Sequence, residues 1–453
     1  MKIPVSPPDS DRFLSELLAA PNGVDRLQQV LALDLGPAPG GKYRHWDTFR
    51  HAPPRTDFTA EEQWFAVKSA RNALARPLLL TDTRHRPFKV ALPAPALAML
   101  HRIDRDAAGN LGGAFVGTEP ITNPATRETY LFKSIVEEAI TSSQLEGAST
   151  TRKVAKAMIQ EGRPATTRSE RMILNNYRGM LLVREHIHTP LTPRFLLDLQ
   201  HTLTEDTLDD ESAAGRLRTS GEHIVIEDET GVLLHTPPAA HELAERMRAL
   251  CDFANEAHDI EFVHPVVRAI LLHLWLAYDH PFVDGNGRTA RALFYWSMAR
   301  AGYWLCEYVS ISRILRKARG QYARAYLYTE TDDNDATYFL LYQLRVLCRA
   351  IDDLKEYLHR KARELHDIER RVYRASLDGL NTRQLALIRH ALTSQYTRYT
   401  VASHQRSHGI SYETARSDLL RLVQLGLLRQ SKQGKAFVFH PTEDIHQRIP
   451  TAR

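Results

Sequence analysis

The sequence predicts a mainly α-helical protein that carries a small β-hairpin within its helical core and a winged helix-turn-helix domain at its C-terminal end. Three observations support this fold class. Residues 120–335 have an almost continuous helical pattern, and the one β-rich interruption lies at residues 224–234. Further helices and a second hairpin follow within residues 375–453. Charged residues make up 25% and hydrophobic residues 43% of the chain, which is typical of globular proteins and excludes wholesale disorder.

The N-terminal region, residues 1–119, is predicted to hold short helices at Asp11–Leu18 and Ala60–Ala75, separated by prolines. The longest uncharged apolar run, Ala269–Tyr278, is far shorter than the roughly 20 residues that cross a bilayer. The first residues also lack the apolar stretch of a secretory signal. We therefore expect no membrane contact and a cytoplasmic protein. The three cysteines lie far apart in apolar segments, which predicts core positions for them.

The predicted core, residues 120–335, contains two features outside its main helices. A helix at about residues 131–147 has an apolar side formed by Ile135, Ala139 and Ile140, and Gly147 is expected to end it. At residues 222–236, two short β-rich runs flank a polar turn and predict a hairpin over 224–234. Because an isolated hairpin is only marginally stable, we expect this one to serve a function.

The C-terminal part begins with a predicted helical spacer, residues 336–374. Residues 375–453 hold 11 Lys and Arg against 5 Asp and Glu, so the excess positive charge of the chain lies there. The pattern predicts two helices and a hairpin with its turn at Gly434, an order that resembles a winged helix-turn-helix domain. The predicted elements are Gln384–Leu392, Tyr412–Leu425, Leu427–Arg429 and Ala436–Phe439.

The densest chemical signal is the run HPFVDGNGRTAR at residues 280–291. Helices predicted at Val266–Tyr278 and Thr289–Ala301 place it in a loop that leads into a helix N-terminus, where backbone N–H groups lack partners and favour anions. Gly285, Asn286 and Gly287 let the backbone approach such an anion closely. The sequence therefore predicts a phosphate site.

Four side chains of this run suit the chemistry of a nucleotide. Arg288 and Arg291 lie three residues apart on one side of the predicted helix and offer two fork-shaped donors, which suggests more than one phosphate. Asp284 is a hard carboxylate suited to Mg²⁺. His280 can accept a proton near neutral pH, as a general base must. Each feature alone is common in ordinary turns, but together they predict a catalytic loop.

The run resembles the Fic family signature His-Pro-Phe-x-Asp-Gly-Asn-Gly-Arg-x-x-Arg at every specified position. The resemblance extends over about residues 129–340, and it implies transfer of AMP from Mg·ATP to a hydroxyl of a target protein. It also implies the roles of the site residues. His280 would deprotonate the hydroxyl, Asp284 would hold Mg²⁺, Asn286 would position the α-phosphate, Gly285 and Gly287 with Arg288 would hold the β-phosphate and leaving pyrophosphate, and Arg291 would hold the γ-phosphate.

A second motif, Ser142-x-x-x-Glu146-Gly147, lies near the end of the helix at 131–147. Its spacing alone is that of an ordinary helix end. It is similar to the inhibitory signature of one Fic class, and this implies that Glu146 pairs with Arg291 and excludes the γ-phosphate. The hairpin at 224–234 resembles the family's flap, on which a target segment carrying a Tyr, Thr or Ser hydroxyl would dock by strand addition. Tyr322 and Tyr326, four residues apart, are candidates to flank adenine.

Two alternatives stay open from the sequence. The chain can be a DNA-binding regulator with the Fic domain as its sensor, in which case Ser411–Arg421 is the recognition helix and Arg416 and Arg421 contact duplex DNA. Winged helices also bind proteins. Alternatively, Glu146 can align a water for removal of AMP. The sequence leaves open the target protein, the choice of nucleotide and whether the chain forms a homodimer.

Overall fold

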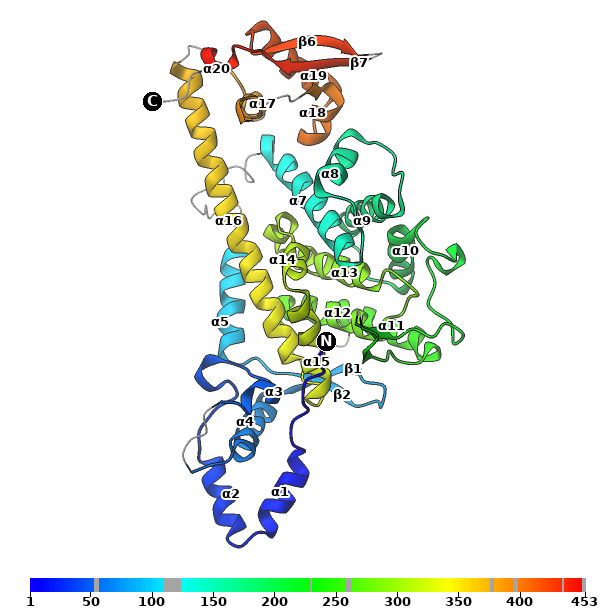
Figure 1. Ribbon diagram of the computed structural model, residues 1–453, viewed down its shortest axis with the longest axis vertical. Coiled ribbons are helices and arrows are strands. Elements are labelled where there is room, and N and C mark those ends of the chain that lie inside the picture. Colours follow the sequence, from blue (N-terminus) through cyan, green and yellow to red (C-terminus); the bar gives the residue numbers. More distant parts are fainter. Residues whose placement is uncertain are drawn as a thin grey trace.

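The computed structural model describes residues 1–52, 57–108, 124–228, 230–257, 262–374, 379–393, 398–433 and 436–449. The molecule is elongated, with the N-terminal region at one end, a large helical body in the middle and the C-terminal region at the other end (Figure 1). The mainly α-helical fold expected from the sequence is confirmed. The predicted domain boundary after residue 119 lies outside the described residues, and the one after residue 374 lies directly before such a segment.

The N-terminal region combines helices with a hairpin that the sequence analysis did not predict. The two expected helices are present, and a capping box between Thr59 and Glu62 starts the second of them. A small cluster of Trp46, Phe49, Trp64 and Val67 forms its core. The elements are α1 (Ser10–Ala19), α2 (Gly23–Leu31), α3 (Trp46–Phe49), α4 (Ala60–Leu74), β1 (Arg76–Thr81), β2 (Pro87–Val90) and α5 (Ala94–Ile103).

The middle of the molecule is a helical body built around α12, which is buried on all sides. This explains why its sequence is apolar almost throughout rather than on one face. Cys251, Cys306 and Cys348 are buried as free thiols, as expected. The helices are α7 (Pro124–Leu145), α8 (Arg152–Glu161), α9 (Arg168–Glu185), α10 (Pro193–Thr204), α11 (Leu243–Ala254), α12 (Pro265–Asp279), α13 (Asn286–Arg300), α14 (Ile311–Lys317), α15 (Arg319–Thr331) and α16 (Thr337–Arg374).

The hairpin expected at 224–234 is present but short. It consists of β3 (Ile226–Glu227) and β4 (Leu233–His235), paired antiparallel with Ile226 opposite His235. Val225, Val232 and Leu233 are exposed on it. This hairpin therefore presents apolar side chains to solvent beside the helical body.

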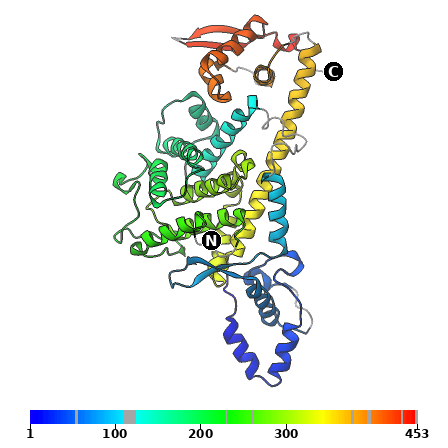
Figure 2. The ribbon, with the colours of Figure 1, turned by 180° about the vertical axis from the view of Figure 1, so that it is seen from behind.

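Helix α16 joins the middle and C-terminal regions and is visible as the long yellow helix in both ribbon views (Figures 1 and 2). Its first half lies in the main hydrophobic core, where Phe339, Leu340 and Leu344 are fully buried. Its last turns approach the C-terminal region, where Val372 joins a separate hydrophobic cluster. The first half of α16 thus belongs to the main hydrophobic core, and its second half connects that core to the C-terminal region.

Among its described residues, the C-terminal region has four helices and a three-stranded antiparallel sheet in the order β5-β7-β6. Helices α18 and α20 and strand β5 were not predicted, whereas α17, α19 and the hairpin were. Gly434, the predicted turn, lies outside the described residues. The chain order is helix, strand, two helices and hairpin, followed by a short last helix. The elements are α17 (Thr382–Thr393), β5 (Tyr399–Thr400), α18 (Val401–His408), α19 (Tyr412–Gln424), β6 (Leu428–Gln433), β7 (Ala436–Pro441) and α20 (Ile445–Arg448).

Within the part of the chain that the structure describes, none of the helices combines the length and the apolar character needed to cross a membrane.

Candidate active site

The run at residues 280–291 forms the connection between α12 and α13. His280 ends α12 in the left-handed region with φ of 45°, and Gly285 precedes α13 with φ of 86°. A side chain at Gly285 would also meet the methyl group of Thr204, so glycine is required there for both reasons. Helix α13 starts at Asn286, three residues earlier than predicted, and Asn286 and Gly287 therefore belong to its first turn.

A set of hydrogen bonds fixes the backbone of this loop. The Asn286 side chain accepts a hydrogen bond from Phe282 N at 2.9 Å and donates one to Phe282 O at 2.8 Å. Phe282 is fully buried beneath the loop. Gln200 of α10 donates to Asp284 O at 3.0 Å. The Asn286 amide is thus committed to the loop backbone, a contact that the sequence analysis did not predict.

His280 is half-buried at the edge of the site. Its Nδ1 lies 3.3 Å from the carbonyl oxygen of Ala277, and because a carbonyl only accepts, this nitrogen carries the proton. The Nε2 atom then keeps its lone pair. Burial lowers the pKa of His280 to about 4, so the imidazole is neutral at pH 7. A neutral imidazole with a free Nε2 lone pair can act as a general base.

Arg291 is the point at which the two sequence motifs meet. Its guanidinium is 2% exposed and donates through Nη2 to Glu146 Oε1 at 2.8 Å. The Nε atom donates to Ser142 Oγ at 2.8 Å, and Nη2 also lies 3.1 Å from Ser142 O. Glu146 follows the last turn of α7, and Gly147 there has φ of 95°. The resemblance predicted this pairing, and the structure brings these residues together.

The remaining residues of the loop lie around the same helix start. Arg288 is fully buried, where it donates to Leu203 O at 2.6 Å and to Asp284 Oδ2 at 3.2 Å. Its Nε atom lacks a hydrogen-bond partner among the described residues, which leaves one buried donor available. Gly287 lies against the Glu146 carboxylate so closely that an added methyl group would overlap it.

Asp284 is the residue of this loop that can hold a metal ion. Its side chain is 40% exposed, so its carboxylate is accessible from solvent although Arg288 contacts one oxygen. Groups of three or more potential metal ligands do not occur among the residues described here. Mg²⁺ at nucleotide sites commonly uses only one or two protein carboxylates together with phosphate oxygens. The single carboxylate of Asp284 fits that requirement.

A cavity of about 220 Å³ opens beside these groups. Its lining includes His280, Gly287, Arg291 and Glu146, together with Tyr322 and Tyr326 of α15. The two tyrosines contact each other edge to face, and their hydroxyl groups are 3.0 Å apart. Tyr322 also contacts the buried His273 at 2.8 Å. The tyrosines therefore line the cavity and pack against its wall at the same time.

Two polar residues at the base of the hairpin also belong to the site, although the sequence analysis assigned them no role. His235 contacts Glu330 through Nδ1 and Tyr278 O through Nε2, both at 2.8 Å. Burial opposes its charge, but the hydrogen bond and charge of Glu330 raise the pKa of His235. Arg218 donates to His280 O at 2.9 Å. In the sequence, the one indication of a role for His235 and Arg218 was that they stand next to the two β-rich runs of the hairpin.

Comparisons with known proteins agree with this geometry. Residues 190–298 match the Fic/DOC family model. Protein adenylyltransferase Fic of Nematostella vectensis is 41% identical over 90 residues, which are 20% of this chain and 19% of that protein. The Drosophila melanogaster protein of the same name is 45% identical over 69 residues, or 15% of this chain and 14% of that protein. The chain thus spans less than a fifth of the length of these relatives.

Similar solved structures include a Fic family protein from Desulfovibrio desulfuricans G20, with a TM-score of 0.49 and 19% identity, covering 78% of this chain and 96% of that one. Fic-1 from C. elegans has a TM-score of 0.45 and 17% identity, covering 78% and 97%. The family match contains the whole loop from His280 to Arg291. This chain therefore carries a Fic/DOC family domain.

Proposed function

We propose that this protein is an autoinhibited protein adenylyltransferase, which transfers AMP from Mg·ATP to a hydroxyl group of a target protein or of itself and releases pyrophosphate. The observation that carries the proposal is the arrangement of a neutral His280 beside the start of α13, where Gly287 and Arg291 line one cavity. The name protein adenylyltransferase Fic, which the similar proteins bear, supports the same reaction.

In the proposed reaction, Nε2 of His280 takes the proton of the target hydroxyl. The hydroxyl oxygen then forms a bond to the α-phosphorus, and the bond between this phosphorus and the oxygen bridging to the β-phosphate breaks. Pyrophosphate carries away the bond's electron pair. The free N–H groups at the start of α13 and the guanidinium of Arg291 stabilise the charge on the phosphates. Arg288 supports this charge from beneath the loop.

Asp284 would hold Mg²⁺, which neutralises phosphate charge when it is bound. Asn286 serves the reaction by holding the loop at Phe282, so that the N–H groups of the first helical turn stay aimed at the phosphates. We assign it a positioning role beside the α-phosphate. Tyr322 lines the cavity near Arg291 and is the candidate contact for the adenine ring.

The proposed inhibition is a competition between two anions for one guanidinium. Glu146 already occupies Nη2 of Arg291, and Ser142 occupies Nε. A γ-phosphate that needs this arginine must displace the carboxylate, and otherwise the nucleotide binds in a pose unsuited to transfer. The close approach of Glu146 to Gly287 adds steric exclusion at the same place.

The hairpin β3–β4 is the proposed docking edge for the target segment. Its exposed Val225, Val232 and Leu233 provide apolar contacts, and an extended segment can pair with its free edge. His235 anchors the end of β4 to α12 and α15 through its two hydrogen bonds. A docked hydroxyl would therefore approach a hairpin whose base is fixed next to His280.

The test is incubation of the protein with a lysate and with either α-labelled or γ-labelled ATP. We expect label in protein only from α-labelled ATP, at a low level for the wild type and a high level for Glu146→Gly, and none for Glu146→Gly with His280→Ala. Incorporation from γ-labelled ATP would indicate phosphorylation and refute the proposal. Release of label from protein that already carries AMP, lost on Glu146→Gly, would instead support AMP removal.

A second candidate function, DNA binding by the C-terminal region, is favoured by one observation. Arg416 and Arg421 lie on exposed parts of α19, the helix that would enter the groove. Glu413 lies 3.8 Å from Arg416 and weakens this positive charge. Binding of duplex DNA that weakens steeply with salt would support this function.

A further inference from the structure

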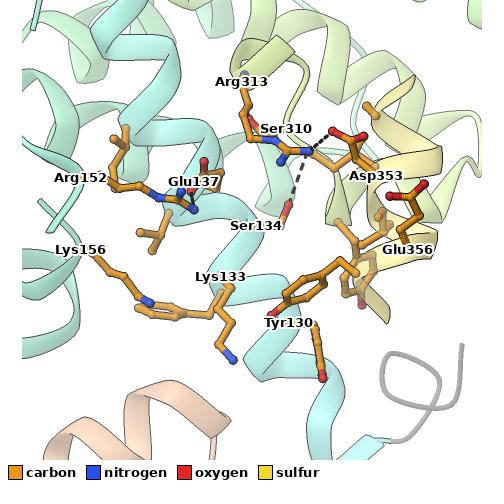
Figure 3. Close-up of a pocket in the computed structure, with 18 of the residues that line it drawn as sticks. Tyr130, Lys133, Ser134, Glu137, Arg152, Lys156, Ser310, Arg313, Asp353 and Glu356 are labelled. Carbon is orange, nitrogen blue, oxygen red and sulfur yellow. Dashed lines mark hydrogen bonds and ion pairs between the residues drawn. The ribbon is translucent and has the colours of Figure 1, made fainter. Parts of the chain in front are cut away.

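Two cavities lie between α7 and the helices that surround its N-terminal half. One, of about 440 Å³, is enclosed by α7, α8, α14 and α16 (Figure 3). The other, of about 400 Å³, lies between α7, α8, α16, α17 and α18. Tyr130, Lys133 and Lys156 line both cavities. These three residues define the crevice considered below, which lies more than ten residues along α7 from Glu146.

Most charged groups in the first cavity are already paired. Arg313 contacts Asp353 at 2.6 Å, and Arg152 contacts Glu137 at 2.5 Å. Lys133 and Lys156 differ, because within the described part of the chain neither has a carboxylate within ion-pair distance. In Figure 3 both ammonium groups point to the lower edge of the cavity, away from the Arg313–Asp353 pair.

The surroundings of Lys133 are cationic rather than acidic. Burial lowers the pKa of Lys133 to about 8, and the charges of Arg389, Lys156 and Lys361 lower it in the same direction. Of the carboxylates near the crevice, Glu364 contacts Lys361 at 2.7 Å and Arg389 at 3.8 Å, Glu161 contacts Arg398 at 3.8 Å, and Glu356 lines the first cavity on an exposed position of α16. The charges that act on Lys133 are thus mutually repelling cations, and a bound anion would relieve that repulsion.

The walls of the crevice suit a small molecule. Tyr130 of α7 and Tyr357 of α16 face each other edge to face at 6.1 Å, and the ammonium group of Lys133 lies 5.4 Å from the Tyr130 ring. Each cavity falls within the usual volume range of small-ligand sites. Helices line the crevice on several sides, which leaves room for a small molecule and not for a nucleic acid duplex.

We infer that the crevice at Lys133 and Lys156 binds a phosphate-bearing small molecule, held between α7, α8 and α17. Lysine ammonium groups are compact point charges that commonly bind phosphate, and a polyphosphate satisfies two of them at once. Arg389 and His390 of α17 line the same space, so the ligand would contact the C-terminal region as well as α7. This site is separate from the cavity at Arg291 and does not depend on the transfer reaction.

The first test is lysine labelling of the unmodified full-length protein, with inorganic tripolyphosphate as the probe. A limiting amount of an acylating reagent is added at pH 7.5, and labelling of each lysine is followed by mass spectrometry with and without tripolyphosphate. We expect several-fold protection of Lys133 and Lys156, and none of Lys153, which is exposed on α8 outside both cavities. Equal labelling of Lys133 with and without the probe would overturn the inference.

The second test measures tripolyphosphate affinity by calorimetry in an Arg291→Ala background, which weakens binding at the candidate nucleotide site. Lys133→Gln with Lys156→Gln should lower the remaining affinity by about tenfold or more. The control, Lys153→Gln with Lys317→Gln, removes the same charge from positions outside both cavities and should leave the affinity unchanged. Equal effects of the two pairs would show non-specific charge attraction and overturn the inference.

Two further probes define the ligand class. Citrate should protect Lys133 much less than tripolyphosphate does, and equal protection would overturn the assignment to phosphate. A duplex DNA that protects Lys133 where tripolyphosphate does not would overturn the assignment to a small molecule. If the double lysine variant fails to fold, the labelling experiment on the unmodified protein still decides the question.

Discussion

Replacing Glu146 by glycine removes the carboxylate that occupies Arg291 and should raise the transfer rate. The contact joins a guanidinium that is 2% exposed to a carboxylate that is 31% exposed, at 2.8 Å. A charge-assisted hydrogen bond of this kind contributes about 1.5–3 kcal/mol. If transfer requires a free Arg291, loss of this hydrogen bond raises the fraction of protein molecules competent for transfer by roughly 10- to 150-fold. The initial rate of AMP incorporation from α-labelled ATP should rise within that range.

The comparison needs a glycine control at a similar position. Glu185 is exposed and ends α9, so Glu185→Gly changes a helix end without touching Arg291. It should leave the rate unchanged. Glu146→Gln keeps the shape and loses the charge, and its rate should lie between those of wild type and Glu146→Gly. Equal rates for wild type and Glu146→Gly at saturating Mg·ATP would refute the competition.

A double variant tests whether the activation acts through Arg291. Glu146→Gly with Arg291→Ala should lose most of the activation, because the released donor is no longer present. The two changes should therefore be strongly non-additive, as expected for groups in contact. Activation that persists fully without Arg291 would show that Glu146 inhibits by blocking space at Gly287 instead.

The remaining predictions concern the base, the metal, the pH profile and the C-terminal region. His280→Ala should lower transfer by roughly 10²- to 10⁴-fold with ATP affinity retained, and a parallel loss of affinity would show a structural role. The Asp284→Ala variant should need a Mg²⁺ concentration about tenfold or more above that of the wild type for transfer. An unchanged Mg²⁺ dependence would show that Asp284 does not belong to the metal site. Because burial lowers the pKa of His280 to about 4, kcat/KM should fall only toward that pH, and an inflection near 6.5 assigned to His280 by NMR would contradict this. As the pH falls, His280 takes up its proton near pH 6.5 in the unfolded chain but only near pH 4 in the folded protein. Protonation therefore lowers the free energy of unfolding progressively between pH 6.5 and about 4. Arg416→Ala with Arg421→Ala should abolish any salt-sensitive DNA binding without changing AMP incorporation.

The sequence predicted the parts of the site that depend on local chemistry. The order of apolar helix, polar loop and new helix correctly predicted a loop that leads into the start of α13, although the helix begins at Asn286 rather than Thr289. The left-handed Gly285 explains this difference, because it ends the loop and allows the next residue to be helical. Residue type and order carry this kind of information.

The spacing of residues in the sequence could not predict contacts between distant segments. Glu146 and Arg291 lie 145 residues apart, and only the family resemblance indicated their pairing. His235 and Glu330 lie 95 residues apart, and neither stands in a recognisable motif. Helix α18 was missed because its sequence, VASHQRSH, is mostly polar, and its capping box uses Ser403 in place of an acidic residue. Tertiary contacts define this helix more than its own sequence does.

Helix α7 lies beside both the proposed ligand crevice and the residues that contact Arg291. Near its N-terminal end, Thr129 contacts His408 of α18 at 2.8 Å. At its C-terminal end, Ser142 and Glu146 hold Arg291. A ligand in the crevice at Lys133 would therefore contact the helix whose last turn precedes Glu146. Truncation of the chain after Arg374 would remove α17 and α18 from α7, so it changes the setting of that element as well as any DNA affinity. Point variants on α19 separate the two functions better, because Arg416 and Arg421 lie on α19 and not on α17 or α18, which contact α7.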